Sequence, residues 1–181
     1  MKTYKELTQL VSDIPANYHD DTFELLCRYI PQLPAGDFLE FGTGLARATV
    51  FIAHLNPDLK ITTFDNAVPY NYPDYDAHIE KTLKDHGVDT SRVNHFIADS
   101  LVYEDPRMFV GMNIDSGHTY DLTYKELVKW GPRVKSGGFI INDDYGDTKV
   151  EVGPAIDKFL EDYGDGYEVV YKNMCMVLKK L

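Results

Sequence analysis

Residues Asp37–Thr49 read DFLEFGTGLARAT, and this stretch decides the fold. A short apolar run ends in a turn that carries Gly42 and Gly44, and a stretch with helical spacing of apolar residues follows. Glycines let the backbone approach a ligand closely, and the N-terminus of a helix presents unpaired N–H groups. The pattern predicts a strand, a turn and a helix, with a ligand beyond the carboxyl end of the strand.

The turn differs from the dinucleotide-binding fingerprint G-x-G-x-x-G. Arg47 stands where that fingerprint has its third glycine, which argues against the form of the motif that binds NAD. A plain strand-to-helix connection with no ligand is the alternative interpretation of the turn.

The rest of the chain alternates short apolar runs with longer amphipathic stretches. Strands are predicted at Asp37–Phe41, Leu59–Phe64, Val93–Ala98, Phe109–Ile114, Gly138–Asn142, Tyr167–Tyr171 and Cys175–Leu178. Helices are predicted at Phe23–Tyr29, Ala46–Leu55, Asp76–His86, Thr119–Trp130 and Val152–Tyr163. The last two strands are close enough to form a hairpin, and the connection between Asp99 and Phe109 is too short and proline-interrupted for a helix. This order predicts an α/β fold, a mostly parallel sheet with helices on both faces.

Length and composition favour one soluble domain. The 181 residues predict a single unit, 1–181, with an N-terminal helical segment (1–35) and a core (36–181). A net charge of −11 is a poor match for nucleic acid or for an anionic membrane surface, so we expect a small-molecule substrate.

Neither cysteine belongs to a metal-binding motif. Cys27 and Cys175 lie in apolar runs without a C-x-x-C or Cys/His pattern, which favours small core residues and a reducing compartment. The first residues lack the apolar core of a signal peptide, and no apolar stretch approaches the roughly 20 residues that span a bilayer. We therefore expect a cytoplasmic protein.

Acidic residues follow the second and third predicted strands. Asp65 comes at the end of one and Asp99-Ser100 at the end of the other, while Glu40 lies in the first strand. An acid at the end of the second strand suits hydrogen bonds to ribose hydroxyls. Each residue taken singly is better explained as a helix cap or turn residue. Three acids at three successive strand ends together favour a ligand site.

The ends of the fourth and fifth strands carry more polar groups. The fourth runs into Asp115 and His118, and the fifth into Asn142, Asp143 and Asp144. If the two strands are neighbours, three carboxylates and an amide oxygen converge, a set suited to Mg²⁺, Mn²⁺ or Ca²⁺. His118 beside them could accept a proton from a substrate hydroxyl. The alternatives are a solvated turn for the acids and a helix-capping role for His118.

Five segments together resemble the class I S-adenosylmethionine-dependent methyltransferases. They read FLEFGTGLARATVFIA, ITTFD, IADS, MNIDSGHTYDLTYKELVKWGPRVKSGGFIINDDY and GPAIDKFL. The similarity covers roughly residues 36–178 and is greatest to the metal-dependent O-methyltransferases of the catechol and macrolide-sugar type. It implies a Rossmann-like three-layer sandwich with a seven-stranded sheet in the order 3-2-1-4-5-7-6, in which strand 7 is antiparallel.

The resemblance also implies roles for individual residues. Cofactor contacts would come from Glu40, Gly42, Thr43, Gly44, Asp65, Asn66, Asp99, Ser100 and Asp115. Among them Asp65 would hold the ribose hydroxyls, and Asp99 and Ser100 would flank the adenine. A divalent cation, expected to be Mg²⁺, would be held by Asp115, Asp143 and Asp144. Asp115 and His118 would be the catalytic residues, with His118 as the base.

The implied activity is methyl transfer from S-adenosylmethionine to a hydroxyl of a small molecule. A metal-independent enzyme that uses this cofactor, and a module that binds the cofactor or a nucleotide without turnover, are the alternatives. Three segments are candidates for the acceptor pocket, namely 1–22, Ala67–Tyr75 and Tyr145–Val152. The first of these could instead serve packing of a homodimer. One departure is Ala46, which stands where many relatives have glycine.

Overall fold

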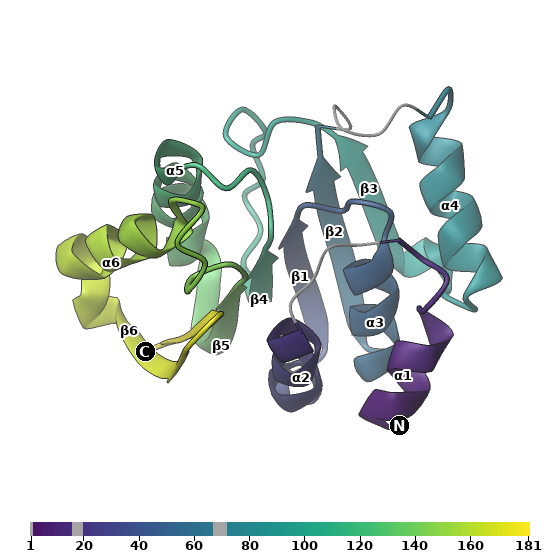
Figure 1. Ribbon diagram of the computed structural model, residues 1–181, viewed down its shortest axis with the longest axis horizontal. Helices are drawn as coiled ribbons and strands as arrows, with labels where there is room; N and C mark the ends of the chain where they lie inside the picture. Colours follow the sequence, from purple (N-terminus) through teal and green to yellow (C-terminus); the bar gives the residue numbers. More distant parts are fainter. Residues whose placement is uncertain (1, 16–19, 67–71) are drawn as a thin grey trace.

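The computed structural model describes residues 2–15, 20–66 and 72–181, which form a seven-stranded sheet in the order β3-β2-β1-β4-β5-β7-β6 (Figure 1). The strands are β1 (Gly36–Phe41), β2 (Leu59–Asp65), β3 (Val93–Ile97), β4 (Phe109–Ile114), β5 (Val134–Asn142), β6 (Tyr167–Lys172) and β7 (Met176–Lys180). Strands β1 to β5 pair in parallel, whereas β7 runs antiparallel to both β5 and β6. The predicted topology is confirmed.

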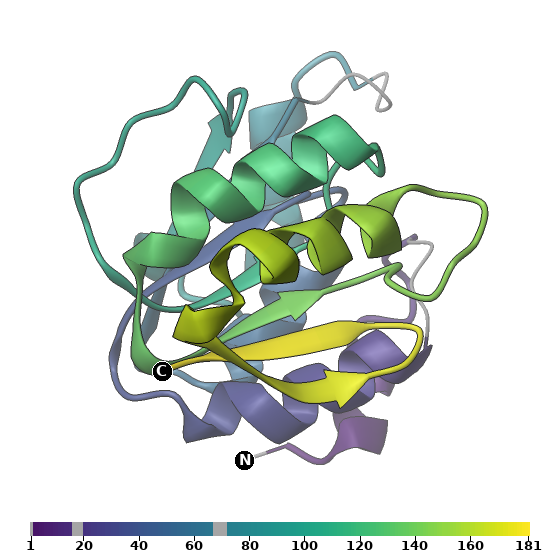
Figure 2. The same cartoon turned by 90° about the vertical axis from the view of Figure 1, so that its left-hand side faces the viewer.

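Helices cover both faces of this sheet. They are α1 (Tyr4–Leu10), α2 (Asp20–Tyr29), α3 (Arg47–Leu55), α4 (Tyr75–Asp85), α5 (Tyr120–Trp130) and α6 (Val152–Tyr163). The first four lie on one face, and α5 and α6 lie on the other, in front of the sheet in Figure 2. Side chains along β1 alternate between the two cores, since Phe38 packs on the side of α1–α4 and Leu39 on the side of α5 and α6.

Strand β5 begins four residues earlier than its sequence predicts. The stretch after Val134 resembles a turn because it contains Gly137 and Gly138, yet it pairs with β4 across an irregularity in the register. Gly137 has a positive φ of 80°, and a Cβ on Gly138 would lie 2.4 Å from the carbonyl oxygen of Val110. The two glycines thus permit a bulged strand at a close approach of two backbones.

The connection from β3 to β4 contains no helix, as predicted, and α5 holds it in place. Trp130 Nε1 donates to the carbonyl oxygen of Ser100 at 3.0 Å, and Lys129 Nζ donates to that of Leu101 at 2.8 Å. Lys129 also reaches the carbonyl oxygen of Tyr103. These bonds from the last turn of α5 fix the loop next to the carboxyl end of the sheet.

The residues that follow the parallel strands lie side by side at the carboxyl end of the sheet. The hydrogen-bond ladder continues past the strand ends, because Asp115 N donates to Phe41 O at 2.9 Å and Asp143 N donates to Ile114 O at 3.0 Å. Parallel strands have their carboxyl ends at the same end of the sheet. Polar residues from distant parts of the chain therefore lie close together at the carboxyl ends of the strands.

Candidate functional site

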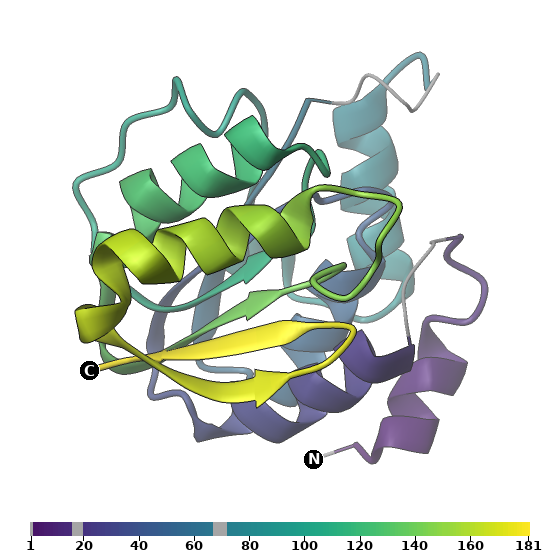
Figure 3. The ribbon, with the colours of Figure 1, turned by 60° about the vertical axis from the view of Figure 1, so that its left-hand side comes forward.

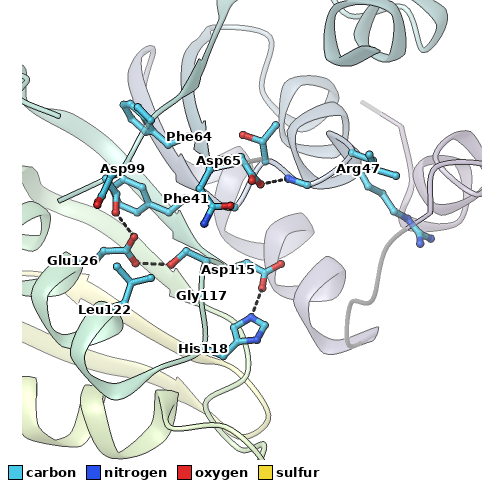
Figure 4. Close-up of a pocket in the computed structure, with 18 of the residues that line it drawn as sticks. Phe41, Arg47, Phe64, Asp65, Asp99, Asp115, Gly117, His118, Leu122 and Glu126 are labelled. Atoms are coloured by element: carbon cyan, nitrogen blue, oxygen red, sulfur yellow. Dashed lines mark hydrogen bonds and ion pairs between the residues drawn. The ribbon is translucent and has the colours of Figure 1, made fainter. Parts of the chain in front are cut away.

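A cavity of about 610 Å³ lies at the carboxyl ends of β1 to β4. Nine predicted site residues line it, namely Gly42, Thr43, Gly44, Asp65, Asn66, Asp99, Ser100, Asp115 and His118. Figure 4 shows the labelled members of this set facing a common space between the strand ends and α5. The volume falls within the range of roughly 300–1,000 Å³ that is usual for ligand pockets.

The glycine turn is shaped by close backbone contacts. Gly42 has a φ of 89°, and a Cβ there would lie 1.8 Å from the carbonyl oxygen of Asp115. Gly44 N donates to Asp65 Oδ2 at 2.8 Å, so the end of β2 holds the turn after β1 (Figure 4). The hydroxyl of Tyr75 donates to the carbonyl oxygen of Gly44. The turn is therefore fixed from three directions.

Ala46 adopts a left-handed backbone conformation with a φ of 68° directly before α3. Its side chain is fully buried. A residue with a Cβ pays roughly 1–2 kcal/mol for this conformation, which glycine adopts freely. The geometry of the turn thus favours glycine at this position, and this chain adopts the bend with alanine.

Glu40 is not among the residues that line the cavity, so its role as a cofactor contact stays a prediction. It lies on the same face of β1 as Phe38, toward α3, where its Oε2 accepts a hydrogen bond from Thr49 Oγ1 at 2.6 Å. Its Oε1 has no hydrogen-bond partner among the described residues. Complete burial raises the pKa of Glu40 to about 7. The alternation of β1 directs the side chain of Glu40 toward α3, and the hydrogen bond with Thr49 joins the strand to that helix.

Three side chains form a candidate metal centre beside the cavity, at the carboxyl end of the sheet. Asp115, His118 and Asp144 each offer a ligand atom, and the three atoms lie within 4.8 Å of one another. His118 Nε2 is 3.0 Å from Asp144 Oδ2 and 3.4 Å from Asp115 Oδ1. The hydrogen bond with Asp115, together with the charge of Asp144, raises the pKa of His118, although partial burial opposes the shift. The adjacent carboxylates thus attract a positive charge at this point.

Asp143 and Asn142 are not part of this group of three, so the role of Asp143 as a metal ligand stays a prediction. Asp143 is 3% exposed, and its Oδ1 accepts a hydrogen bond from Thr22 Oγ1 at 2.8 Å. Asn142 is fully buried and donates weakly to Met176 O at 3.4 Å. Asn142 follows the alternation of β5 to the side of α5 and α6, and Asp143 Oδ1 lies between Thr22 and Cys175 on the side of α2.

Glu126 of α5 lines the cavity and was missed by the sequence analysis. Its two carboxylate oxygens accept hydrogen bonds from Ser100 Oγ and, at 2.6 Å, from Ser116 Oγ (Figure 4). It therefore joins the loops that follow β3 and β4. A signal was present in the sequence, since Glu126 occupies the same helical face as the buried residues Thr123, Leu127 and Trp130.

The structure describes only parts of two segments proposed for the acceptor pocket, 1–22 and Ala67–Tyr75. Pro15 from the segment 1–22 lines the cavity, whereas residues 16–19 lie outside the described residues. In Ala67–Tyr75, residues 67–71 also lie outside the described residues, and Tyr75 begins α4 instead of ending a loop. Arg47 lines the cavity as well, and its guanidinium lies 5.3 Å above the ring of Phe23.

Glu126→Gln is expected to change how stability depends on pH. Burial raises the pKa of Glu126 to about 7 from an ordinary value of 4.5, so folding favours the neutral carboxyl. The contribution of this group to stability is therefore greatest below pH 4.5 and is lost as the pH rises to about 7. Glutamine stays neutral, so we expect the variant to gain about 3 kcal/mol relative to the wild type between pH 4.5 and pH 8.

Urea unfolding at the two pH values measures this difference. The exposed Glu168, on the edge strand β6, provides a matched control, because Glu168→Gln makes the same chemical change in water. A difference between the Glu126→Gln variant and the wild type that is the same at both pH values would contradict the prediction.

Comparisons of the sequence find no matching family model and no matching curated protein. Solved structures with the same architecture are found. CalS11, a TDP-rhamnose 3'-O-methyltransferase, aligns with a TM-score of 0.67 and 18% identity over 97% of this chain and 92% of its own. SMU.1697c from Streptococcus mutans, described as a methyltransferase and solved in complex with SAH, aligns with a TM-score of 0.67 and 15% identity over 88% and 98% of the two chains.

An rRNA methylase from Streptococcus thermophilus aligns with a TM-score of 0.65 and 12% identity, over 91% of this chain and 99% of its own. The strand order, the antiparallel β7 and these similarities define the fold as the Rossmann-like fold of the class I methyltransferases. Within the described part of the chain, no helix has the length and apolar character to cross a membrane.

Proposed function

We propose that this protein is an S-adenosylmethionine-dependent methyltransferase that methylates a hydroxyl group of a small molecule with the help of a divalent cation. One observation carries the proposal. The cavity that collects the predicted cofactor residues shares Asp115 and His118 with the candidate metal centre. A methyl donor in the cavity and an acceptor hydroxyl at the centre would therefore lie next to each other.

The charge of the cavity lining suits this cofactor. S-adenosylmethionine supplies a reactive methyl group on a positively charged sulfonium. The lining contains the acids Asp65, Asp99, Asp115 and Glu126, and the side chain of Arg47 is directed toward Phe23, away from Asp115 (Figure 4). Asp65 at the end of β2 would hold the ribose hydroxyls, and Asp99 with Ser100 would flank the adenine.

The donor set of the candidate metal centre suits Mg²⁺ or Mn²⁺. Two carboxylates and an imidazole lie within reach of one point, and Mg²⁺ is usually bound by one or two carboxylates together with water and substrate oxygens. Asp115 and Asp144 would hold the cation. When bound, it would supply positive charge that makes a neighbouring hydroxyl more acidic.

His118 would accept the proton of the acceptor hydroxyl. Its Nε2 faces Asp115 and Asp144, and 44% of its side chain is exposed. A divalent cation between the two carboxylates would favour the neutral imidazole, because like charges in close contact disfavour protonation. The main contribution of the chain would be to orient the donor and the acceptor, which lowers the barrier to a two-reactant step.

The comparisons support this proposal in two respects. CalS11 methylates a sugar hydroxyl, and SMU.1697c is solved with SAH, the demethylated form of the cofactor. Nucleic acid is a second substrate class among structures with this fold, as in the rRNA methylase. The net charge of −11 disfavours it, because nucleic-acid binding depends on neutralising phosphates with Lys and Arg.

Asp65→Ala is expected to weaken SAH binding by about 10- to 100-fold, which corresponds to the loss of one or two hydrogen bonds to a charged group. Isothermal titration calorimetry with SAH measures the change. Asp58→Ala provides the control, since Asp58 is exposed at the opposite end of the same strand, next to Leu59. Equal weakening in both variants, or no binding of S-adenosylmethionine and SAH by the wild type with and without Mg²⁺, contradicts the cofactor assignment.

A turnover assay separates the three functional alternatives. The wild type is incubated with S-adenosylmethionine and a panel of hydroxylated small molecules, and SAH release is measured with Mg²⁺, with Mn²⁺ and with EDTA. Release that EDTA abolishes supports the metal-assisted enzyme. Release that survives EDTA supports a metal-independent enzyme, and cofactor binding without release across the panel supports a binding module.

A further inference from the structure

We infer that Glu126 determines which purine the cavity accepts, because it engages the hydrogen of the Ser100 hydroxyl and leaves that oxygen as an acceptor for an amino group. The inference deepens the proposed function and rests on it for the place of the adenine. Glu126 is a positioning residue in this arrangement, since it acts on the nucleoside through Ser100 and selects a purine with an exocyclic amino group.

Both oxygens of the Glu126 carboxylate are engaged by hydroxyl donors. Ser100 Oγ donates to Oε1, and Ser116 Oγ donates to Oε2 at 2.6 Å (Figure 4). A serine hydroxyl has one hydrogen and two lone pairs. Each hydrogen is directed to Glu126, so each serine has only acceptor capacity left for any other group that it contacts.

The Ser100 hydroxyl borders a part of the cavity that suits a planar ring. Ser100 and Glu126 line the cavity together with the apolar side chains of Phe41, Phe64 and Leu122. In Figure 4, Glu126 lies on the same side of the cavity as Phe41 and Leu122. Apolar side chains with a small number of polar groups among them are the usual surroundings of a bound ring system, and those polar groups fix its orientation.

The backbone of Ser100 is held as firmly as its side chain. In Figure 3 the connection between β3 and β4 runs past the C-terminal end of α5. There the carbonyl oxygen of Ser100 accepts from Trp130 Nε1 at 3.0 Å, and that of Leu101 accepts from Lys129 Nζ at 2.8 Å. Ser100 is 7% exposed. Three residues of α5 therefore hold this loop, and Glu126 is the one that orients the hydroxyl.

Glu126 lies in the interior without a cation beside it. It is 1% exposed, and burial raises its pKa to about 7. The other described groups that act on this pKa are Ser100, Ser116 and Asp99, and none of them is a cation. A buried carboxylate costs free energy that a link between two loops does not require. Glutamine would join the loops without a charge, but its amide would donate to one serine and free that hydroxyl to donate to a ligand.

The ligand that fits this arrangement is an aminopurine. The amino group of adenine is a donor, and Ser100 Oγ would accept from it. An oxopurine has a carbonyl oxygen in place of the amino group, so two acceptors would face each other and both would lose their partners. A site that is built to hydrogen-bond one group of a ligand rejects the analogue that lacks it.

The experiment compares SAH with S-inosylhomocysteine, which differs in having the oxopurine. Isothermal titration calorimetry at about pH 8.5 keeps Glu126 ionised, because this pH lies above its pKa of about 7. We expect the wild type to bind SAH about 10- to 100-fold more tightly than S-inosylhomocysteine. We expect the preference of Glu126→Met to fall to within about threefold, since the free Ser100 hydroxyl can donate to a carbonyl oxygen or accept from an amino group.

Ser100→Ala keeps the inference testable if Glu126→Met does not fold. It removes the acceptor itself, so we expect SAH binding to weaken by about 10- to 100-fold and S-inosylhomocysteine binding to change by less than about threefold. Asp121→Asn is the control, because Asp121 is exposed on the same helix and pairs with Lys125. This variant loses one negative charge of α5 and should keep the preference of the wild type.

The ratio of the two affinities decides the role of Glu126. A merely structural role would weaken both ligands alike, so an unchanged preference in Glu126→Met or in Ser100→Ala overturns the inference. A wild type that binds the two ligands equally also overturns it, and the cofactor assignment then stands on the SAH affinity. A wild type that binds neither ligand rejects the cofactor assignment of the proposed function, and the inference with it.

Discussion

Replacement of Gly42 by alanine is expected to abolish SAH binding and to lower the free energy of unfolding by about 3–5 kcal/mol. The new Cβ would lie 1.8 Å from the carbonyl oxygen of Asp115 and 2.6 Å from its carbonyl carbon. These atoms belong to the backbone directly after β4, so they cannot turn aside as a flexible side chain would. Relief of the clash must separate the ends of β1 and β4, and that movement displaces Asp115 from the cavity.

Gly87→Ala is the matched control for this prediction. Gly87 has a similar positive φ, 71°, but a Cβ there would meet no atom within 4 Å. It should therefore show only the backbone cost, about 1–2 kcal/mol, with SAH binding unchanged. Urea unfolding and calorimetry with SAH measure both quantities. Similar losses in the two variants would mean that backbone conformation, and not the contact with Asp115, governs the position.

His118→Gln is expected to lower the rate of methyl transfer by about 10²–10⁴-fold, the usual contribution of general acid–base catalysis. Glutamine can donate and accept hydrogen bonds but cannot take up a proton near neutral pH. SAH release at saturating S-adenosylmethionine and Mn²⁺ measures the rate. SAH affinity should change little, because the predicted contacts to adenine and ribose come from Asp65, Asp99 and Ser100.

His54→Gln serves as the control for His118. His54 lies in the last turn of α3, away from the carboxyl ends of the strands, and its Nε2 lies 2.8 Å from the carbonyl oxygen of His86. We expect the rate of this variant to match the wild type. A His118→Gln variant with an unchanged rate at saturating substrate would reject His118 as the base and would leave the centre with a binding role.

Local patterns in the sequence located the strands and helices, and the resemblance to the methyltransferases supplied their order in the sheet. A short apolar run located β4 at Phe109–Ile114, and helical spacing before Gly164 located α6 at Val152–Tyr163, with the bounds that the structure has. These signals are local because a strand or helix must present its apolar side chains with its own period. Tertiary pairing changed the prediction at β5, where Gly137 and Gly138 allow a bulged extension that resembles a turn in sequence.

The residues at the strand ends were also largely predictable. In a parallel sheet the carboxyl ends meet at one edge, so Asp65, Asp99 and Asp115 had to lie near one another once the strands were located. Glu126 was not found in this way, because it reaches the cavity from α5, whose packing against the sheet is not a local property.

The sequence by itself therefore determined where the strands and helices lie along the chain and that polar groups gather at the carboxyl ends of the parallel strands. The tertiary structure alone decided which of those groups face one another. Asp143 and Asp144 are adjacent and chemically identical, yet Thr22 and Cys175 engage the first in the interior while a left-handed bend turns the second toward His118. The direction of a side chain at a strand end depends on partners far away in the chain, which no local period encodes.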